Sequence, residues 1–141
     1  LWVPLEFGGS GIIAAWAACL LAQKWDVPVV SFKRAGVDAA LLFIGYVVTG
    51  IFVGQNGLTL LILLALAAIS VGTRVNRFVI VASLVAAVIG PLSEALVSRA
   101  GFFHYHFADP IPYWLPLLWV ISAGLFIDGA VLVFGLKPRT V

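Results

Sequence analysis

Residues 78–97 read FVIVASLVAAVIGPLSEALV and carry a single charged side chain, Glu94. At a rise of about 1.5 Å per residue, a helix of this length spans the roughly 30 Å hydrocarbon core of a bilayer. Four other segments are similarly apolar, and the full set is Val3–Ala22, Val37–Val53, Leu58–Gly72, Phe78–Val97 and Tyr113–Phe134. The pattern predicts an all-α, polytopic transmembrane helical bundle of about five spans, forming one domain over residues 1–141.

The overall composition supports a membrane location. Hydrophobic residues make up 63% of the chain and charged residues 10%, with a mean hydropathy of +1.17. This small number of charged side chains cannot cover the surface of a water-soluble domain. Membrane lipids are therefore the expected surroundings. Nucleic acid is not an expected partner, because the basic residues lie in short loops between spans rather than on one face.

The basic residues also predict the orientation of the chain. Seven of the eight follow the first, third and fifth spans, and these are Lys24, Lys33, Arg34, Arg74, Arg77, Lys137 and Arg139. Short loops rich in Lys and Arg stay on the cytoplasmic side, so the C-terminus is expected there and Leu1 on the opposite side. Because the sequence contains no Met and opens at Leu1, we expect one more helix upstream, six in all.

Glu94 and Asp128 are acidic residues inside predicted spans. A carboxyl such as Glu94 is costly in hydrocarbon unless the protein shelters it, which indicates either the polar end of a ligand pocket or a helix-packing contact. Asp128 lies on the following span, on the order of 10 Å or more from Glu94 in depth, so the two are not expected to form a catalytic pair. For Asp128 we expect a structural contact with Ser or Thr on a neighbouring helix.

A lipid-binding site is the functional interpretation of the Glu94 position. On this interpretation polar groups at similar depth fix the head of a lipid, and aromatic residues after the fourth span form a lid. The candidate lipid-binding residues are Glu94, Glu6, Ser10, Phe102, Phe103 and Tyr105.

Other chemistry has little support in the sequence. His104, His106 and Asp109 are metal-ligand types, but a site generally needs three or four ligands and a second shell, so interfacial histidines are the better interpretation. Cys19 is the single cysteine, and no phosphate-binding loop or nucleophile elbow is present. No metal, no cofactor and no catalytic residue is therefore expected.

Several local motifs follow one another in a recognisable order. They are Trp2-Val3-Pro4, Phe32-Lys33-Arg34, Leu58-Thr59-Leu60, Ala67-Ala68-Ile69-Ser70, Gly101-Phe102-Phe103-His104-Tyr105 and Trp114-Leu115-Pro116. Their order across nearly the whole chain resembles the Insig family, the six-helix membrane proteins of the sterol-regulatory system. In that family the first helix precedes the Trp-Val-Pro segment.

The resemblance implies a lipid-binding regulator that is not an enzyme. Insig proteins bind oxysterols within the bundle and hold sterol-sensing membrane proteins in the endoplasmic reticulum. Arg74 stands where the family has an Asp linked with holding the partner Scap, so the resemblance does not carry Scap binding over to this chain. An Ala- and Val-rich sequence without Met suits a bacterial homologue in the plasma membrane, whereas a eukaryotic one would lie in the endoplasmic reticulum.

The preferred hypothesis is a cleft between helices that binds a neutral lipid, either a sterol or a diacylglycerol-like molecule. The alternative is a membrane enzyme that acts on a lipid or isoprenoid, with Glu94 as acid/base beside His104 or His106. A small solute carrier is disfavoured, because the sequence shows neither internal repeats nor paired intramembrane charges. Gly- and Ala-rich faces in the first two spans are compatible with a homo-oligomer.

Overall fold

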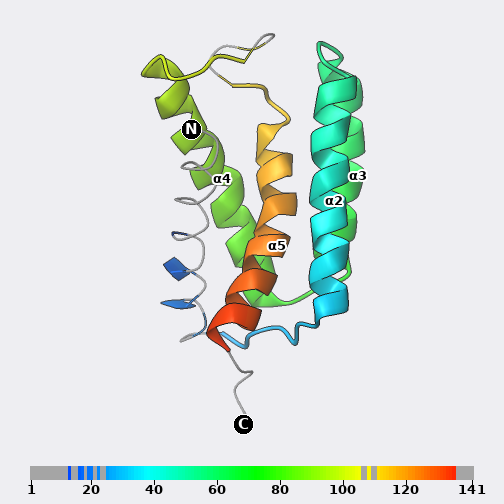
Figure 1. Cartoon of the computed structure of the whole chain (residues 1–141), viewed down its shortest axis with the longest axis vertical. Coiled ribbons are helices and arrows are strands. Elements are labelled where there is room, and N and C mark those ends of the chain that lie inside the picture. Colours follow the sequence, from blue (N-terminus) through cyan, green and yellow to red (C-terminus); the bar gives the residue numbers. More distant parts are fainter. Residues whose placement is uncertain are drawn as a thin grey trace.

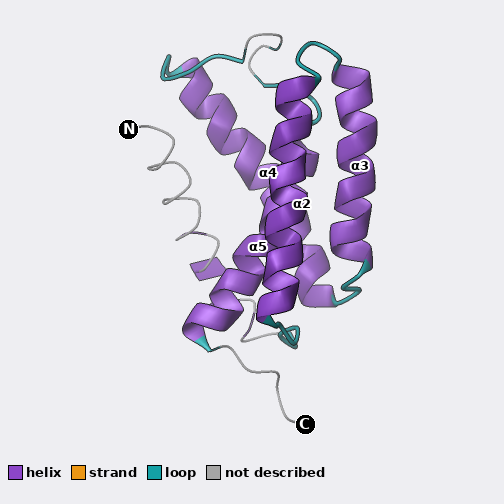
Figure 2. Cartoon of the chain, turned by 45° about the vertical axis from the view of Figure 1, so that its right-hand side comes forward, coloured by secondary structure: helices purple, strands orange, loops and turns teal. Residues whose placement is uncertain are grey.

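The structure, a computed structural model, describes residues 13, 16–17, 19–20, 22, 25–105, 108 and 111–135. Within them it contains four helices and no strand (Figures 1 and 2), namely α2 Phe32–Ile51, α3 Asn56–Gly72, α4 Arg77–Arg99 and α5 Leu115–Phe134. By length and composition α2, α4 and α5 are able to cross a membrane, and α3 is an apolar helix of 17 residues. The chain is an all-helical integral membrane protein.

The five predicted spans are not all matched. Four of them correspond to α2, α3, α4 and α5. The first, Val3–Ala22, lies largely outside the described residues. Its described members are all helical, and they are Ile13, Trp16, Ala17, Cys19, Leu20 and Ala22.

Helix α2 begins earlier than the hydropathy pattern predicts, at Phe32 rather than Val37. The Ser31 side chain caps the helix by accepting a hydrogen bond from the Arg34 backbone N–H at 3.2 Å. The hydropathy pattern excludes Lys33 and Arg34, but a capped helix can include them, since Lys33 is exposed and Arg34 pairs with Asp38. As a result Arg34 and Asp38 lie one turn apart on the same helix.

Helix α5 forms the centre of the bundle. It packs against α4 on one side and against α2 and α3 on the other (Figure 1). Half of the residues in its most apolar stretch are buried inside the bundle, compared with 17% in the corresponding stretch of α2. Polar side chains on α5 are therefore held within the protein.

Two apolar cores lie along α5. One joins α4 to the second half of α5 around Phe78, Val79 and Ile127. The other joins α2, α3 and the first half of α5 around Leu63 and Ile121. Between them, these cores fix α5 against every other described helix.

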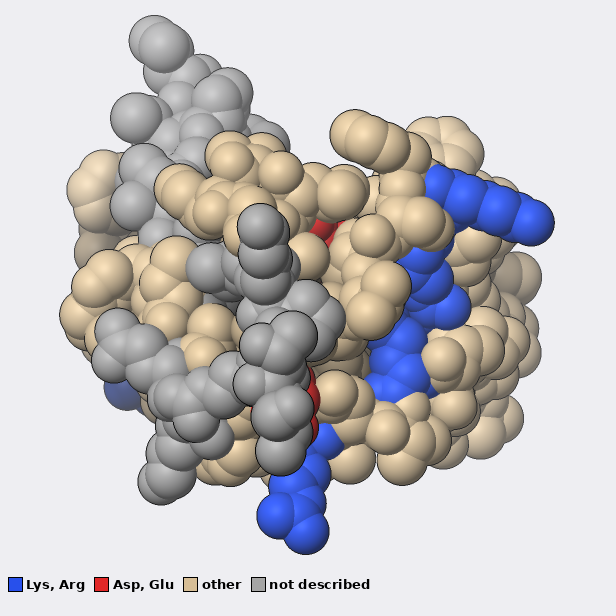
Figure 3. All heavy atoms as spheres, turned by 90° about the horizontal axis from the view of Figure 1, so that it is seen from below, with Lys and Arg blue, Asp and Glu red and all other residues tan. Residues whose placement is uncertain are grey.

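The bundle has two chemically different ends. The basic end comprises the start of α2, the turn between α3 and α4, and the end of α5, and Figure 3 shows Lys and Arg side chains gathered on it. The hairpin end comprises the turn between α2 and α3 and the connection from α4 to α5. Gly54 in that turn has a φ of 81°, a left-handed conformation that glycine adopts without strain.

Candidate functional site

The strongest polar cluster lies inside the basic end. It contains Arg34 and Asp38 on α2, Arg74 in the turn between α3 and α4, and Asp128 on α5, and we call it the Arg74 cluster. The Arg74 guanidinium forms ion pairs with both carboxylates, using Nη2 for Asp38 and Nη1 for Asp128. A single side chain therefore connects α2, α5 and the α3–α4 turn.

Arg34 completes the Arg74 cluster from the side nearer the surface. Its Nη2 donates to Asp38 Oδ1 at 3.2 Å and to the Ser70 carbonyl at 3.3 Å, and its Nε donates to Asp38 Oδ2 at 3.3 Å. Both Asp side chains are 0% exposed, whereas Arg74 is 7% and Arg34 is 22% exposed. Two positive and two negative charges balance, as burial of ions requires.

Gly124 makes room for this arrangement. A Cβ atom at that position would lie 2.9 Å from Arg74 Nη2 and 3.0 Å from Ser70 Oγ. A glycine on α5 thus lets the guanidinium reach the centre of the bundle. Burial lowers the pKa of Arg74, and the neighbouring Asp128 carboxylate opposes that shift.

The Arg74 cluster corrects two expectations. The prediction that Asp128 contacts Ser or Thr is wrong, since its hydrogen-bond partner is Arg74. The expectation of no paired charges inside the membrane, which counted against a solute carrier, is also wrong. Asp38 and Asp128 lie on apolar helices and pair with Arg74. Sequence reasoning missed Asp38 altogether, although its spacing of four residues from Arg34 is typical of a helical ion pair.

The second polar cluster lies nearer the hairpin end and is built on Glu94. Its Oε2 accepts a hydrogen bond from the Tyr105 hydroxyl, and its Oε1 accepts one from Trp119 Nε1 at 2.6 Å. We call Glu94, Tyr105 and Trp119 the Glu94 cluster. As expected, Glu94 and Asp128 do not form a pair, because their hydrogen bonds go to different residues.

Gly90 allows Trp119 to approach Glu94. A Cβ atom on Gly90 would lie 2.0 Å from Trp119 Cδ2 and 2.4 Å from Cε2, so the indole ring packs directly against the α4 backbone. Glu94 follows one turn later on the same helix. The sequence gives no local signal for this contact, because Gly90 and Trp119 lie on different spans.

The Tyr105 hydroxyl contributes measurably to the Glu94 cluster. We expect Tyr105→Phe to lower the free energy of unfolding by about 1 kcal/mol, because one oxygen of a half-buried carboxyl loses its donor. Unfolding in a detergent titration, followed by circular dichroism, measures this loss. Tyr113→Phe is the control, since Tyr113 is 57% exposed. Equal effects of the two substitutions would contradict the assignment.

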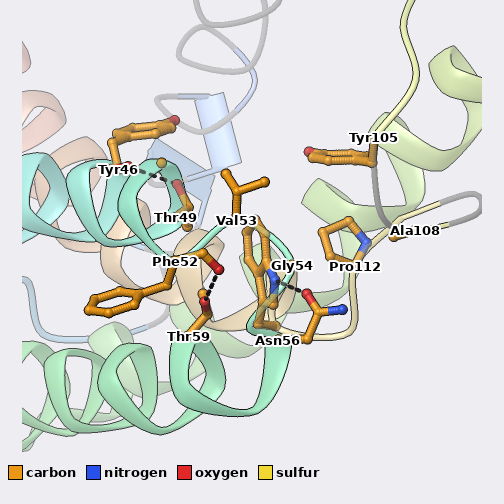
Figure 4. A pocket seen from close by; sticks show the side chains of 12 residues that line it. Tyr46, Thr49, Phe52, Val53, Gly54, Asn56, Thr59, Tyr105, Ala108 and Pro112 are labelled. Atoms are coloured by element: carbon orange, nitrogen blue, oxygen red, sulfur yellow. Dashed lines mark hydrogen bonds between the residues drawn. The ribbon is translucent and has the colours of Figure 1, made fainter.

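A cavity of about 240 Å³ opens at the hairpin end, and we call it the hairpin pocket. It lies between the α2–α3 turn and the connection to α5, and Figure 4 shows Tyr46 and Tyr105 on opposite sides of it. Aromatic and polar side chains share its wall, and they include Tyr46, Thr49, Asn56, Tyr105 and Trp114. Asn56 Oδ1 accepts a hydrogen bond from Trp114 Nε1 at 3.1 Å.

The candidate lipid-binding residues separate into three groups. Tyr105 lines the hairpin pocket and bonds to Glu94, and Phe103 packs edge-on against Tyr105 with ring centroids 5.4 Å apart. Phe102 is 65% exposed. Glu6 and Ser10 lie outside the described residues.

The histidine motif is only partly described. His104 is exposed, whereas His106 and Asp109 lie outside the described residues. In the part of the chain that the structure describes, no three His, Cys, Asp or Glu side chains gather as metal ligands.

Comparison with known proteins places the chain in a family. Residues 37–127 match the family described as Protein of unknown function (DUF2878), and the chain belongs to this family. The matched segment contains Asp38, Arg74, Glu94 and Tyr105. No curated protein and no solved structure matches the chain.

Proposed function

We propose that this member of the DUF2878 family binds a neutral lipid, with the lipid's polar head in the hairpin pocket. The supporting observation is a cavity at one end of an apolar bundle whose wall combines aromatic rings with hydroxyl and amide groups. An amphiphile in a bilayer presents this combination, a polar head next to apolar chains. The tails would lie along the exposed apolar surface of the helices.

The size of the pocket narrows the class of lipid. At about 240 Å³ it falls below the roughly 300–1,000 Å³ of pockets that enclose a whole small ligand. Only part of the lipid enters, so a compact glycerol head with two flexible chains suits it better than a rigid sterol ring system. Of the two lipids considered from sequence, we therefore favour a diacylglycerol-like molecule.

Hydrogen-bonding groups are available for such a head. The Thr49 hydroxyl donates to the Tyr46 carbonyl at 2.8 Å and keeps its oxygen lone pairs as acceptors. Asn56 uses its Oδ1 for Trp114, which leaves the amide NH₂ group as a donor. The Glu94 cluster acts indirectly, because Glu94 holds the hydroxyl of Tyr105, a residue of the pocket wall.

The hydrogen bonds of Glu94 favour lipid binding over catalysis. Both of its oxygens accept hydrogen bonds from protein donors, whereas an acid/base needs an oxygen directed at a substrate. The proposed role is accordingly a non-enzymatic, regulatory or lipid-sensing one. The resemblance of the local motifs to the Insig family favours the same role.

The proposed arrangement in the membrane follows from charge. We place the basic end on the cytoplasmic side, with five crossings in this chain and a cytoplasmic C-terminus. A bacterial protein of this kind would lie in the plasma membrane, and a eukaryotic one in the endoplasmic reticulum. Exposed Gly36 and Gly50 on α2 are compatible with a homo-oligomer.

Filling the hairpin pocket tests the proposal. Gly50 lines the pocket, and a Cβ atom there meets nothing within 4 Å, so a side chain can start at this position without a clash, and Gly50→Leu adds apolar bulk at the pocket wall. We expect this substitution to reduce crosslinking to a photoactivatable diacylglycerol in nanodiscs by about tenfold, equivalent to about 1.4 kcal/mol of binding free energy.

Gly36→Leu is the matched control for the pocket experiment. Gly36 is also an open position on α2, but it lies near the basic end and outside the pocket wall. The control is expected to retain wild-type crosslinking. Equal crosslinking of all three proteins, or crosslinks that map only to the basic end, would refute the proposed site.

A further inference from the structure

The two carboxylates of the Arg74 cluster are not equally satisfied. Asp38 uses both oxygens, since Oδ1 accepts from Arg34 and Oδ2 accepts from Arg34 and Arg74. Asp128 uses only Oδ1, which accepts from Arg74, while its buried Oδ2 has no hydrogen-bond partner among the described residues. A buried ionised oxygen without a donor is costly, so this atom needs a partner that the described residues do not supply.

The charged surroundings of Asp128 are well defined in the described structure. Arg34 and Asp38 approach from α2 and Arg74 from the α3–α4 turn, and α3 contributes the uncharged Ser70 beside Arg74. The ionisable residues of α4 face elsewhere: Arg77 and Arg99 are exposed, and Glu94 bonds to Tyr105 and Trp119. The segment before α2 packs against α5 through Val27, and its Asp26 is exposed, as is Lys33 at the start of α2. Among Asp38, Glu94 and Asp128, only Asp128 has a carboxylate oxygen free to receive a proton without loss of an existing bond.

The cluster also connects this oxygen to the surface. Arg34 is 22% exposed at the basic end; Arg34 and Arg74 both donate hydrogen bonds to Asp38, and Arg74 also donates to Asp128. Proton relays in membrane proteins use Asp, Glu and His side chains, and Arg stays protonated, so the two arginines hold the carboxylates in place rather than pass a proton between them. Asp128 lies at the inner end of the chain, on the central helix.

We propose that Asp128 Oδ2 is a proton-binding site, supplied from water at the basic end, whose occupation loosens α5 from Arg74. An O–H bond forms at Oδ2, the Asp128 side chain changes from −1 to 0, and the net charge of the Arg74 cluster changes from 0 to +1. The ion pair between Arg74 and Asp128 becomes a weaker hydrogen bond from a charged donor to a neutral carboxyl, whereas the ion pair between Arg74 and Asp38 stays intact. Protonation thus weakens the attachment of α5 and leaves that of α2 unchanged.

This inference does not rest on the proposed lipid site, which lies at the opposite end of the bundle. The proposed proton-binding site would make the position of α5 depend on the pH of the solution at the basic end. A two-state element biased by a charge change is the physical requirement for such a sensor.

Infrared difference spectroscopy on the protein in nanodiscs provides the test. On a shift from about pH 8 to about pH 5, a carbonyl band of a protonated carboxyl is expected in the wild type and in Asp38→Asn, and it is expected to be missing from Asp128→Asn. Glu94→Gln is the control for the other carboxyl inside an apolar helix and should keep the band. Absence of the band from the wild type, or its survival in Asp128→Asn, would overturn the proposal.

Hydrogen–deuterium exchange supplies a second readout for the loosening of α5. After correction for the intrinsic pH dependence, amides in the part of α5 after Gly124 are expected to exchange about tenfold faster at the lower pH in the wild type, and at a pH-independent rate in Asp128→Asn. The asparagine keeps an acceptor for Arg74 Nη1, so the variant is expected to fold. A pH response that disappears in Asp38→Asn instead would assign the proton to the wrong carboxylate and overturn the proposal.

Discussion

Arg74→Met is expected to lower the free energy of unfolding by about 3–5 kcal/mol, the largest effect of any single substitution considered for this protein. The substitution leaves Asp38 and Asp128 buried, at 0% exposure, without the guanidinium that compensates both of them. It also releases the α3–α4 turn from α2 and α5. Reversible unfolding in a detergent titration, followed by circular dichroism, measures the loss.

Two further variants separate this explanation from a general effect of removing a positive charge. Arg77→Met changes an exposed arginine at the start of α4 and is expected to alter stability by less than about 0.5 kcal/mol. Asp128→Asn added to Arg74→Met removes the carboxylate left without a partner, since Asp38 keeps its ion pair with Arg34, and it is expected to restore part of the loss. A double variant no more stable than Arg74→Met would contradict the electrostatic explanation.

Gly90→Ala is expected to destabilise the protein by about 2–4 kcal/mol, combining overpacking with loss of a hydrogen bond. The new methyl group would lie 2.0–2.4 Å from atoms of the Trp119 indole, a buried ring that cannot move aside cheaply. Displacing the ring removes the donor to Glu94 Oε1. The same detergent titration measures the effect.

Gly129→Ala is the matched control for Gly90→Ala. Gly129 lies within α5, and a Cβ atom there meets nothing within 4 Å. Alanine is therefore expected to stabilise the helix by about 0.5–1 kcal/mol through its higher helix propensity. If the two substitutions changed stability in the same direction and by similar amounts, close packing at Gly90 would not be the cause.

Two of the residues singled out from the sequence, Glu94 and Tyr105, meet in the structure, and the features that mark them are local. Glu94 stands out as a carboxyl within an apolar run, and the aromatic residues that follow α4 include Tyr105, which does contact it. Trp119 and the α2–α3 turn could not be added from sequence, because their positions relative to Glu94 depend on how α5 packs between the other helices. The hairpin pocket likewise exists only where separate segments meet.

The contacts of the Arg74 cluster could be predicted from the sequence even less than those of the Glu94 cluster. Arg74 is 36 residues from Asp38 and 54 residues from Asp128, and each residue alone has an ordinary local explanation. Arg74 fits a basic loop that sets topology, and Asp128 fits a polar contact within a bundle. Only the central position of α5, with a glycine at 124, brings the two carboxylates onto one guanidinium.

The amino-acid sequence by itself determined that this protein is helical and lies in a membrane. Long apolar runs in a membrane form helices, because hydrocarbon supplies no hydrogen bonds and a helix satisfies the hydrogen bonds of its own backbone. The tertiary structure alone decided which ionisable groups pair, which carboxylate oxygen lacks a partner among the described residues and where a cavity remains. Those outcomes depend on distances between different helices, and the order of residues along the chain fixes such distances only after the helices pack.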